Sequence, residues 1–395
     1  MATETYDVIV IGSGVTGGSI AYHVARQGRR VLVIDRSAPG VEPSASWASA
    51  GGVRRQGRDK AEAPLAVEAI ERWRTLEEEL GADLHYRRDG NLKVAESDDE
   101  AETITEFVRH QQAMGFDEVR LIDRNEAYEI VPGLNDRVTA GSYAASDGHA
   151  NPPATARAFA AAAERNGATY RNGIEVTGLV ADGSRITGVR TSEGTFSGDA
   201  VVLAAGAWSD DIASTVGLRL PIRTGVYQML LSTSAPSGLL KPVIGGVGRR
   251  LSLKQLPTGQ FFLGGGWPGD CAEDRRSFMM RDESESGNWR EAVELLPAVG
   301  EQRVERKWCG LEAESIDGVP FIGAMPGYEG LTIAVGFSGH GFAISPAVGR
   351  AVADQLAGKD TPELDGLRPD RILSLSDAAI DEFVNEQVSA LPAPG

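Results

Sequence analysis

Six residues near the start of the chain have the types and spacing that bind a pyrophosphate. They are Gly12-Ser13-Gly14-Val15-Thr16-Gly17, and they directly follow the apolar run 6–11. Gly12 allows a tight turn, and Gly14 lets the backbone approach phosphates without a Cβ in the way. A helix starting here would point free N–H groups and its positive dipole end at the phosphates. We therefore predict a dinucleotide site.

The elements that must position this turn are also present. A strand over residues 6–11, a helix through Ala21 and Ala25, and a second strand over 31–34 complete a βαβ unit. Asp35 ends the second strand, where a carboxylate accepts hydrogen bonds from ribose hydroxyls. The alternative is an ordinary βαβ unit whose glycines serve packing alone.

Composition excludes several classes of protein. The chain has 395 residues, 48 of them glycine, and a net charge of −17. Its length predicts two lobes. Its charge argues against nucleic-acid and anionic-membrane partners, so an anionic substrate must meet a local arginine cluster. Cys271 and Cys309 cannot form a disulfide framework, no apolar run would span a membrane, and we expect a cytoplasmic protein without a metal site.

Five further segments, taken with the opening turn, resemble the D-amino-acid-oxidase-like superfamily of FAD-dependent oxidoreductases. The likeness is nearest to the sarcosine oxidase and D-amino-acid dehydrogenase branches, and it covers nearly the whole chain. The segments are Ser49-Ala50-Gly51-Gly52-Val53-Arg54, Asp147-Gly148-His149-Ala150-Asn151-Pro152, Ala204-Ala205-Gly206-Ala207-Trp208-Ser209, residues 308–323, and Gly336-Phe337-Ser338-Gly339-His340-Gly341-Phe342.

The resemblance implies an α/β fold in which a Rossmann-like FAD-binding domain is interleaved with a β-rich α+β substrate domain. The FAD-binding domain would take residues 1–82, 145–220 and 312–360. The substrate domain would take 83–144 and 221–311, and 361–395 would form a C-terminal tail.

It also implies which residues contact non-covalent FAD. The loop 44–52 would pass the flavin edge, although a plain solvent loop is the alternative. The expected contacts are Gly12, Ser13, Gly14, Val15, Thr16, Gly17, Asp35, Arg36, Ser46, Ser49, Ala50, Gly51, Gly52, Val176, Ala205, Gly206, Trp208, Gly310, Gly339, His340, Gly341, Phe342 and Ala343.

Two residues are candidates for the reaction itself. Arg54 matches the family's substrate-carboxylate arginine, and its guanidinium fork suits a carboxylate. His340 is expected to contact the flavin edge largely through its backbone, and the alternatives are a proton role in catalysis and a structural turn histidine. Arg55 and Arg58 are expected on a solvated face.

The His340 turn is expected to precede a helix capped by Ser345-Pro346 and running to about Leu356. The dipole of that helix would stabilise a reduced, anionic flavin.

Departures from the family predict a substrate other than sarcosine. Ala343 and Phe262 stand where sarcosine oxidases have lysines, and Leu251 and Gly266 stand where monomeric members have tyrosine and histidine. Arg250 and Lys254 are either replacement cations or, preferably, sheet-edge charges. Cys309 lies one residue from the position of a covalent flavin tether, where this chain has Trp308, so non-covalent FAD is expected.

The resulting hypothesis is hydride transfer to flavin N5 from an N-alkyl, secondary or D-amino acid or a related amine. The product imine then hydrolyses, and oxygen or another carrier accepts the electrons. One alternative is a 2-hydroxy-acid dehydrogenase with His340 or His149 as its base. Another is a flavin subunit of a larger electron-transfer complex, and homo- and hetero-oligomers both stay open.

Overall fold

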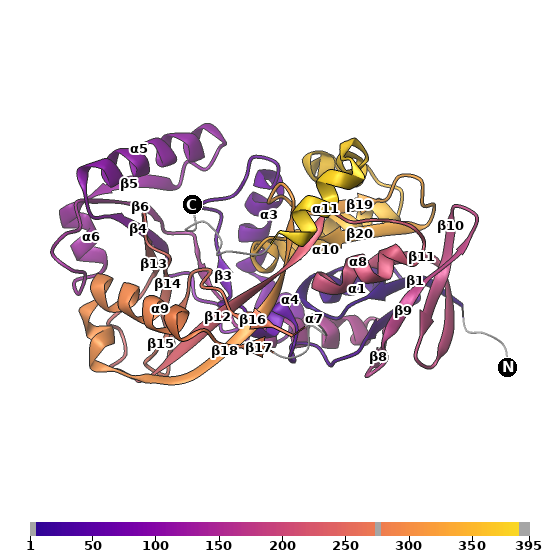
Figure 1. Cartoon of the computed structure of the whole chain (residues 1–395), viewed down its shortest axis with the longest axis horizontal. Coiled ribbons are helices and arrows are strands. Elements are labelled where there is room, and N and C mark those ends of the chain that lie inside the picture. The colour runs from indigo at the N-terminus through magenta and orange to yellow at the C-terminus, as the bar shows by residue number, and fades with distance from the viewer. Residues whose placement is uncertain (1–4, 273–277, 387–395) are drawn as a thin grey trace.

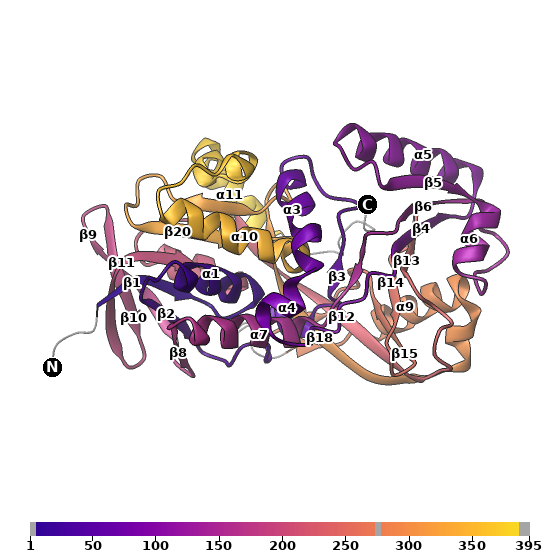
Figure 2. The same cartoon turned by 180° about the vertical axis from the view of Figure 1, so that it is seen from behind.

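Two large β-sheets lie side by side and divide the molecule into two lobes (Figure 1). The computed structural model describes residues 5–272 and 278–386. The mixed architecture confirms the predicted α/β fold class. Figure 2 shows the same two lobes from behind, with α3 (Ala63–Trp73) between them. Within the described residues, no helix combines the length and apolarity needed to cross a bilayer.

The first sheet is built around the predicted βαβ unit. Its main path runs β19-β20-β11-β1-β2-β8, and β20, β11, β1, β2 and β8 are parallel neighbours. The strands are β1 (Thr5–Ile11), β2 (Val31–Asp35), β8 (Thr169–Asn172), β9 (Val176–Asp182), β10 (Arg185–Thr191), β11 (Gly194–Leu203), β19 (Phe321–Ala324) and β20 (Leu331–Val335).

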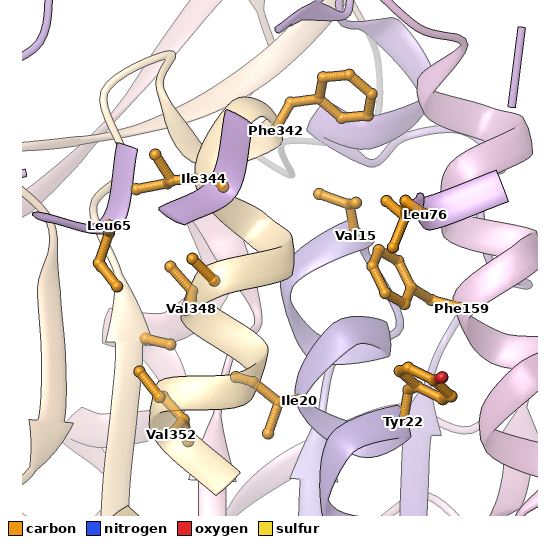
Figure 3. Packing of buried hydrophobic residues seen from close by; sticks show 14 of the residues in the cluster. Val15, Ile20, Tyr22, Leu65, Leu76, Phe159, Phe342, Ile344, Val348 and Val352 are labelled. Carbon is orange, nitrogen blue, oxygen red and sulfur yellow. The ribbon is translucent and has the colours of Figure 1, made fainter. Parts of the chain in front are cut away.

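Three helices cover one face of this sheet: α1 (Val15–Arg26), α7 (Pro152–Arg165) and α10 (Gly341–Leu356). Strand residues alternate between faces, so Val8 and Val10 of β1 pack against these helices, whereas Ile9 and Ile11 pack on the opposite side. Figure 3 shows how α1 is held between its neighbours by apolar side chains, among them Ile20, Phe159 and Val348. Ile20 and Phe159 are fully buried, and each such side chain contributes about 1.5–3 kcal/mol.

The second sheet has the order β18-β12-β15-β14-β13-β4-β6-β5. Helices α5 (Asp98–Ala113), α6 (Arg124–Ile130) and α9 (Asp282–Leu295) lie in the same lobe (Figure 1). The strands are β4 (Asn91–Ala95), β5 (Val119–Asp123), β6 (Ala140–Ala144), β12 (Ile222–Ser234), β13 (Val243–Gly246), β14 (Ser252–Gln255), β15 (Gln260–Gly264) and β18 (Val304–Ser315).

Shorter elements connect the lobes and cover their edges. Two small pairs join β3 (Gly52–Val53) to β7 (Gly148–His149) and β16 (Asp270–Cys271) to β17 (Phe278–Met279). The remaining α-helices are α2 (Ala45–Ala48), α4 (Leu76–Leu80), α8 (Ser209–Ser214) and α11 (Asp377–Asn385).

The strands of the first sheet all fall within residues 1–82, 145–220 and 312–360, while β18 crosses the expected boundary at 311 and 312. The domain bounds stay a prediction, and residues 387–395 of the expected tail lie outside the described residues.

The expected start of the last long helix was wrong by more than a turn. α10 begins at Gly341, so Pro346 lies inside the helix and Ser345 is not its cap. Proline has no N–H to donate to the carbonyl four residues earlier. The Ser345 hydroxyl donates to the neighbouring carbonyl, of Phe342, at 2.9 Å. The helix therefore starts directly at the Gly339-His340-Gly341 turn.

Candidate functional site

A cavity of about 340 Å³ runs from the glycine turn to the start of α10. The expected cofactor contacts that line it are Gly12, Ser13, Gly14, Val15, Thr16, Asp35, Arg36, Ser46, Ser49, Val176, Ala205, Gly206, Trp208, Gly339, Gly341 and Phe342. Segments far apart in sequence are thus gathered around one space. Such a concave, preformed space is typical of a small-molecule site.

One end of the cavity is the N-terminus of α1. Its N-cap residue is Gly14, which has no side chain to cap the helix. A Cβ placed on Gly14 would meet only the Ser46 hydroxyl, at 3.3 Å, so this glycine keeps space open. Ser46 accepts a hydrogen bond from the Val15 N–H at 2.9 Å and ties the loop containing α2 to the helix.

Asp35 holds the end of β2 to the glycine turn. One carboxylate oxygen accepts from the Ser13 N–H at 2.6 Å and from its hydroxyl at 2.9 Å, and the other accepts from the Ser37 N–H at 2.8 Å. A carboxylate has about four acceptor positions, so a ribose hydroxyl can still bind. Next to it the Arg36 guanidinium stacks on Trp208, 3.8 Å from the ring centre.

Several expected contacts do not line the cavity but shape its walls. A Cβ on Gly17 would lie 2.0 Å from the Gly12 carbonyl oxygen, one on Gly51 2.3 Å from the Ala150 oxygen, and one on Gly310 2.2 Å from the Ala48 Cβ. The Ala343 carbonyl accepts from the Trp73 indole at 2.8 Å. Ala50, Gly52 and His340 also lie outside the lining.

The loop after β3 brings Arg54 close to His340. Asp147 shapes this loop, because its two carboxylate oxygens accept from the Arg55 N–H at 3.0 Å and the Gln56 N–H at 3.2 Å. Burial raises the pKa of Asp147 to about 6. Arg54 is half-buried, and burial lowers its pKa.

The charge of Arg54 also lowers the pKa of two neighbouring groups, Lys93 and His340. Burial and the charge of Arg54 together lower the pKa of Lys93 to about 8. Burial, Arg58 and Arg54 lower the pKa of His340, which Glu62 raises in part. The imidazole is therefore mostly neutral at pH 7.

Arg55 and Arg58 are not on a solvated face, so that expectation was wrong. Arg58 is 4% exposed and donates through Nε to the Arg54 carbonyl at 3.2 Å. Arg55 is also buried and donates to the Ser146 hydroxyl at 2.8 Å and to Glu118. Burial lowers the pKa of Arg58 to about 10. Both cations are structural supports of the loop that carries Arg54.

Lys254 is not a sheet-edge charge either. β14 lies inside the second sheet, and Lys254 is 6% exposed. Its amine donates to the Ala50 carbonyl at 2.5 Å and lies 5.1 Å from the centre of the Phe262 ring on the paired strand. Burial lowers its pKa to about 7. Arg250 is half-buried and stacks on Trp267 at 5.6 Å.

His149 lies beside this lysine, with its Nδ1 atom 3.5 Å from the Lys254 amine. Burial and the charges of Lys254 and Arg87 lower its pKa to about 3. A histidine this buried is placed for structure, which leaves His340 as the better-placed base of the two.

The Cys309 thiol is buried against sulfur and backbone atoms, 3.2 Å from the Met280 sulfur. Burial raises its pKa to about 11. It does not line the cavity, and Trp308, its neighbour, points its indole N–H at the Ala48 carbonyl, 3.1 Å away. This placement favours a non-covalent cofactor.

Residue-by-residue reading of the sequence missed three charged groups in the cavity wall, namely Glu175, Asp211 and Glu312. Glu312 lines the cavity between Leu311 and Ala313. The available signal was an acid directly after the half-apolar segment 308–311.

The chain has relatives among known families and proteins. Residues 7–355 match the family described as FAD dependent oxidoreductase. A glycine oxidase of Pseudomonas putida is 31% identical over 370 residues, which cover 89% of this chain and 95% of that protein. A glycine oxidase of Geobacillus kaustophilus is 28% identical over 367 residues, covering 91% of this chain and 95% of that protein.

Among solved structures, an L-proline dehydrogenase from P. horikoshii superposes with a TM-score of 0.86. It is 28% identical, and the match covers 94% of this chain and 99% of that one. The predicted resemblance and the predicted FAD cofactor are confirmed.

The residues present fit FAD. The N-cap residue of α1, Gly14, has no side chain, and it lines the cavity with Val15 and Thr16 of the first turn, as pyrophosphate binding requires. At the opposite end of the cavity, α10 begins at a residue, His340, whose side chain does not cap the helix. The Trp208 indole nitrogen is buried in the cavity wall and has no partner among the described residues, so a ligand acceptor would satisfy it.

Proposed function

The chain belongs to the FAD-dependent oxidoreductase family, and on that premise we propose that it oxidises a C–N bond of an amino acid or a related amine. The observation that supports the proposal best is the group formed by Arg54, Lys93 and His340, the last of which lies between the cavity-lining Gly339 and Gly341. Two cations near a dinucleotide cavity suit a small carboxylate-bearing substrate. The named relatives, the glycine oxidases and an L-proline dehydrogenase, support the same class of substrate.

Different residues would bind the cofactor and orient the substrate. The α1 N-terminus and Asp35 would hold the pyrophosphate and ribose, and the α10 N-terminus would face the flavin. Bound FAD supplies the hydride acceptor, which no side chain can provide. Arg54 orients the substrate carboxylate through its planar fork, and Asp147 fixes the loop that presents Arg54.

His340 is held by Glu62, since its Nδ1 atom lies 3.0 Å from the carboxylate. The proton on Nδ1 then points at Glu62, and the neutral Nε2 is left as an acceptor. We propose that it takes a hydrogen bond from substrate or water at the mouth of the site. We further propose the domain division 1–82, 145–220 and 312–360 for the FAD-binding part, and a cytoplasmic location.

The test is anaerobic reduction of the purified, FAD-loaded chain. The panel contains glycine, sarcosine, L-proline, both enantiomers of other amino acids, and matching 2-hydroxy acids. We expect at least one amine to bleach the visible flavin absorbance and no hydroxy acid to do so. Bleaching by hydroxy acids alone would contradict the proposal, and bleaching of the lone chain would exclude a purely electron-relaying subunit. Mixing the reduced protein with oxygen then separates an oxidase from a dehydrogenase.

A further inference from the structure

Glu312 reaches the cavity from the edge strand of the second sheet. It lies on β18, and side chains on one face of a strand recur every second residue. Trp308 and Gly310 share its face, and both contact Ala48 of α2. Glu312 follows them in the same direction and lines the cavity beside Gly339.

Two carboxylates on this face of β18 have opposite surroundings. Glu314 pairs with Arg223 at 2.9 Å and accepts from the Tyr227 hydroxyl. Glu312 forms no ion pair within residues 5–272 and 278–386, and its polar neighbours are the backbone N–H groups of Gly339 and Ala313. Burial and the charge of Glu314 raise the pKa of Glu312 to about 7.

An ionised carboxylate in this position costs free energy unless positive charge is brought to it, and without that charge it takes up a proton more readily. FAD cannot supply that charge, because its pyrophosphate is anionic and the reduced flavin is neutral or anionic. The neighbouring α2 and first turn of α10 carry no charged side chain, and Gly225 stands opposite Glu312 on β12. The titratable groups on the neighbouring strand β12 are Arg223 and Tyr227, and both bind Glu314. Arg36, Glu175 and Asp211 line the same cavity, where Arg36 stacks on Trp208, and His340 adjoins Gly339. At neutral pH Glu312 is therefore protonated in part, and a cation that holds it ionised would come from a ligand.

We infer that Glu312 is the counter-ion for a protonated amine of the substrate, so that the site accepts cationic amines and disfavours a carboxylate at this wall. The inference rests on the proposed function, which it makes more specific. The amine of the substrate is then directed to Glu312. The amine bound here is either the reacting amine or a second, side-chain amine.

The test uses two ligands of the same shape and different charge. Glycine betaine carries a permanent cation, and 3,3-dimethylbutanoate has carbon in place of that nitrogen. Their dissociation constants are measured from the change in the visible flavin spectrum of the holoenzyme, at pH 5.5 and pH 8. We expect the wild type to prefer betaine about tenfold or more at pH 8. The preference should shrink at pH 5.5, where Glu312 is protonated.

Three variants decide the assignment. Glu312→Gln should bind both ligands equally at both pH values, whereas Glu305→Gln, which removes an exposed charge from the same strand, should behave as the wild type. Glu312→Asp keeps the charge and should keep part of the preference. If Glu312→Gln does not retain FAD, the pH dependence of the wild type and of Glu312→Asp decides the question. A betaine preference that survives in Glu312→Gln, or no binding of betaine to the wild type, overturns the inference.

A second arm separates the two sources of the amine. Anaerobic reduction is followed with lysine and norleucine, in both enantiomers. If Glu312 binds the reacting amine, Glu312→Gln weakens both substrates about equally. If it binds a side-chain amine, lysine alone loses affinity. Amines that bind through Glu312 without bleaching the flavin would contradict the proposed function and leave this inference standing.

Discussion

The Nδ1 atom of His340 lies 3.0 Å from a carboxylate oxygen of Glu62, a residue that is fully buried beneath the turn. The two residues are far apart in sequence, and their contact joins the start of α3 to the start of α10. The pKa of Glu62 is lowered by His340 and Arg58 against the opposing effect of its burial. The charged carboxylate therefore stabilises the fold at the point where the cavity ends.

Glu62→Gln should lower the free energy of unfolding at pH 7 by about 1–3 kcal/mol, because a buried, charge-assisted hydrogen bond is replaced by a neutral one. The folded-state pKa lies below the ordinary 4.5, so this contribution is complete above pH 4.5 and is lost as pH falls through the lowered pKa. Denaturant unfolding at pH 7 and in mild acid measures the difference.

Glu71→Gln is the matched control for Glu62→Gln, since Glu71 lies on the same helix and makes an exposed pair with Arg74. Its effect should stay within about 0.5 kcal/mol. Equal effects of the two substitutions would show that Glu62 adds nothing through His340.

Replacing Gly14 by alanine should lower FAD affinity, whereas replacing Gly17 by alanine should lower the stability of the apoprotein. A Cβ on Gly14 meets only a flexible hydroxyl and intrudes on the cavity, so FAD affinity should fall about tenfold or more while the apoprotein keeps its stability. A Cβ on Gly17 would lie 2.0 Å from a backbone oxygen, so that variant should unfold more easily even without FAD. Flavin titration and thermal melting of the apoprotein separate the two. Loss of apoprotein stability in Gly14→Ala would contradict the assignment of its role.

The cofactor cavity was predictable from sequence because its determinants are local. Gly12, Gly14 and Asp35 belong to one contiguous βαβ unit, and the structure places all three in the cavity wall. The turn at Gly339 was likewise predictable from its own segment. The start of α10 was not, because Ser345-Pro346 satisfies the rules for a helix start equally well inside a first turn, where the serine hydroxyl binds a free carbonyl.

The surroundings of charged residues were not predictable in the same way. Arg55, Arg58 and Lys254 read as surface charges, but each is buried by partners from other segments: Glu118 and Ser146 for Arg55, the Arg54 carbonyl for Arg58, and the Ala50 carbonyl for Lys254. Only the packing of the two sheets against the β3 loop brings these partners together. The sequence pattern predicts which strand a residue occupies, whereas the burial of its charged group depends on tertiary contacts.

Arg54→Ala should weaken carboxylate-bearing amines without affecting amines that lack a carboxylate. Loss of a charge-assisted bond of about 1.5–3 kcal/mol raises the dissociation constant roughly tenfold to a hundredfold. Anaerobic flavin reduction over a range of substrate concentrations gives the constants. Arg88→Ala, at an exposed arginine, is the control. An equal loss for amines with and without a carboxylate would place Arg54 in folding and not in recognition.

Lys254→Met should remove the part of the pH-dependent rise in the free energy of unfolding that Lys254 contributes in the wild type. Burial lowers the folded-state pKa of Lys254 from 10.5 to about 7, so between these values the unfolded chain binds the extra proton. Stability of the wild type therefore increases with pH across this window, and the methionine variant lacks that share, about 2 kcal/mol between pH 7 and 9. Denaturant unfolding at the two pH values measures it, with Lys241→Met as the exposed control. A parallel pH dependence of the wild type and Lys254→Met would mean that Lys254 stays fully protonated in the fold, and that the Ala50 carbonyl and the Phe262 ring compensate its burial.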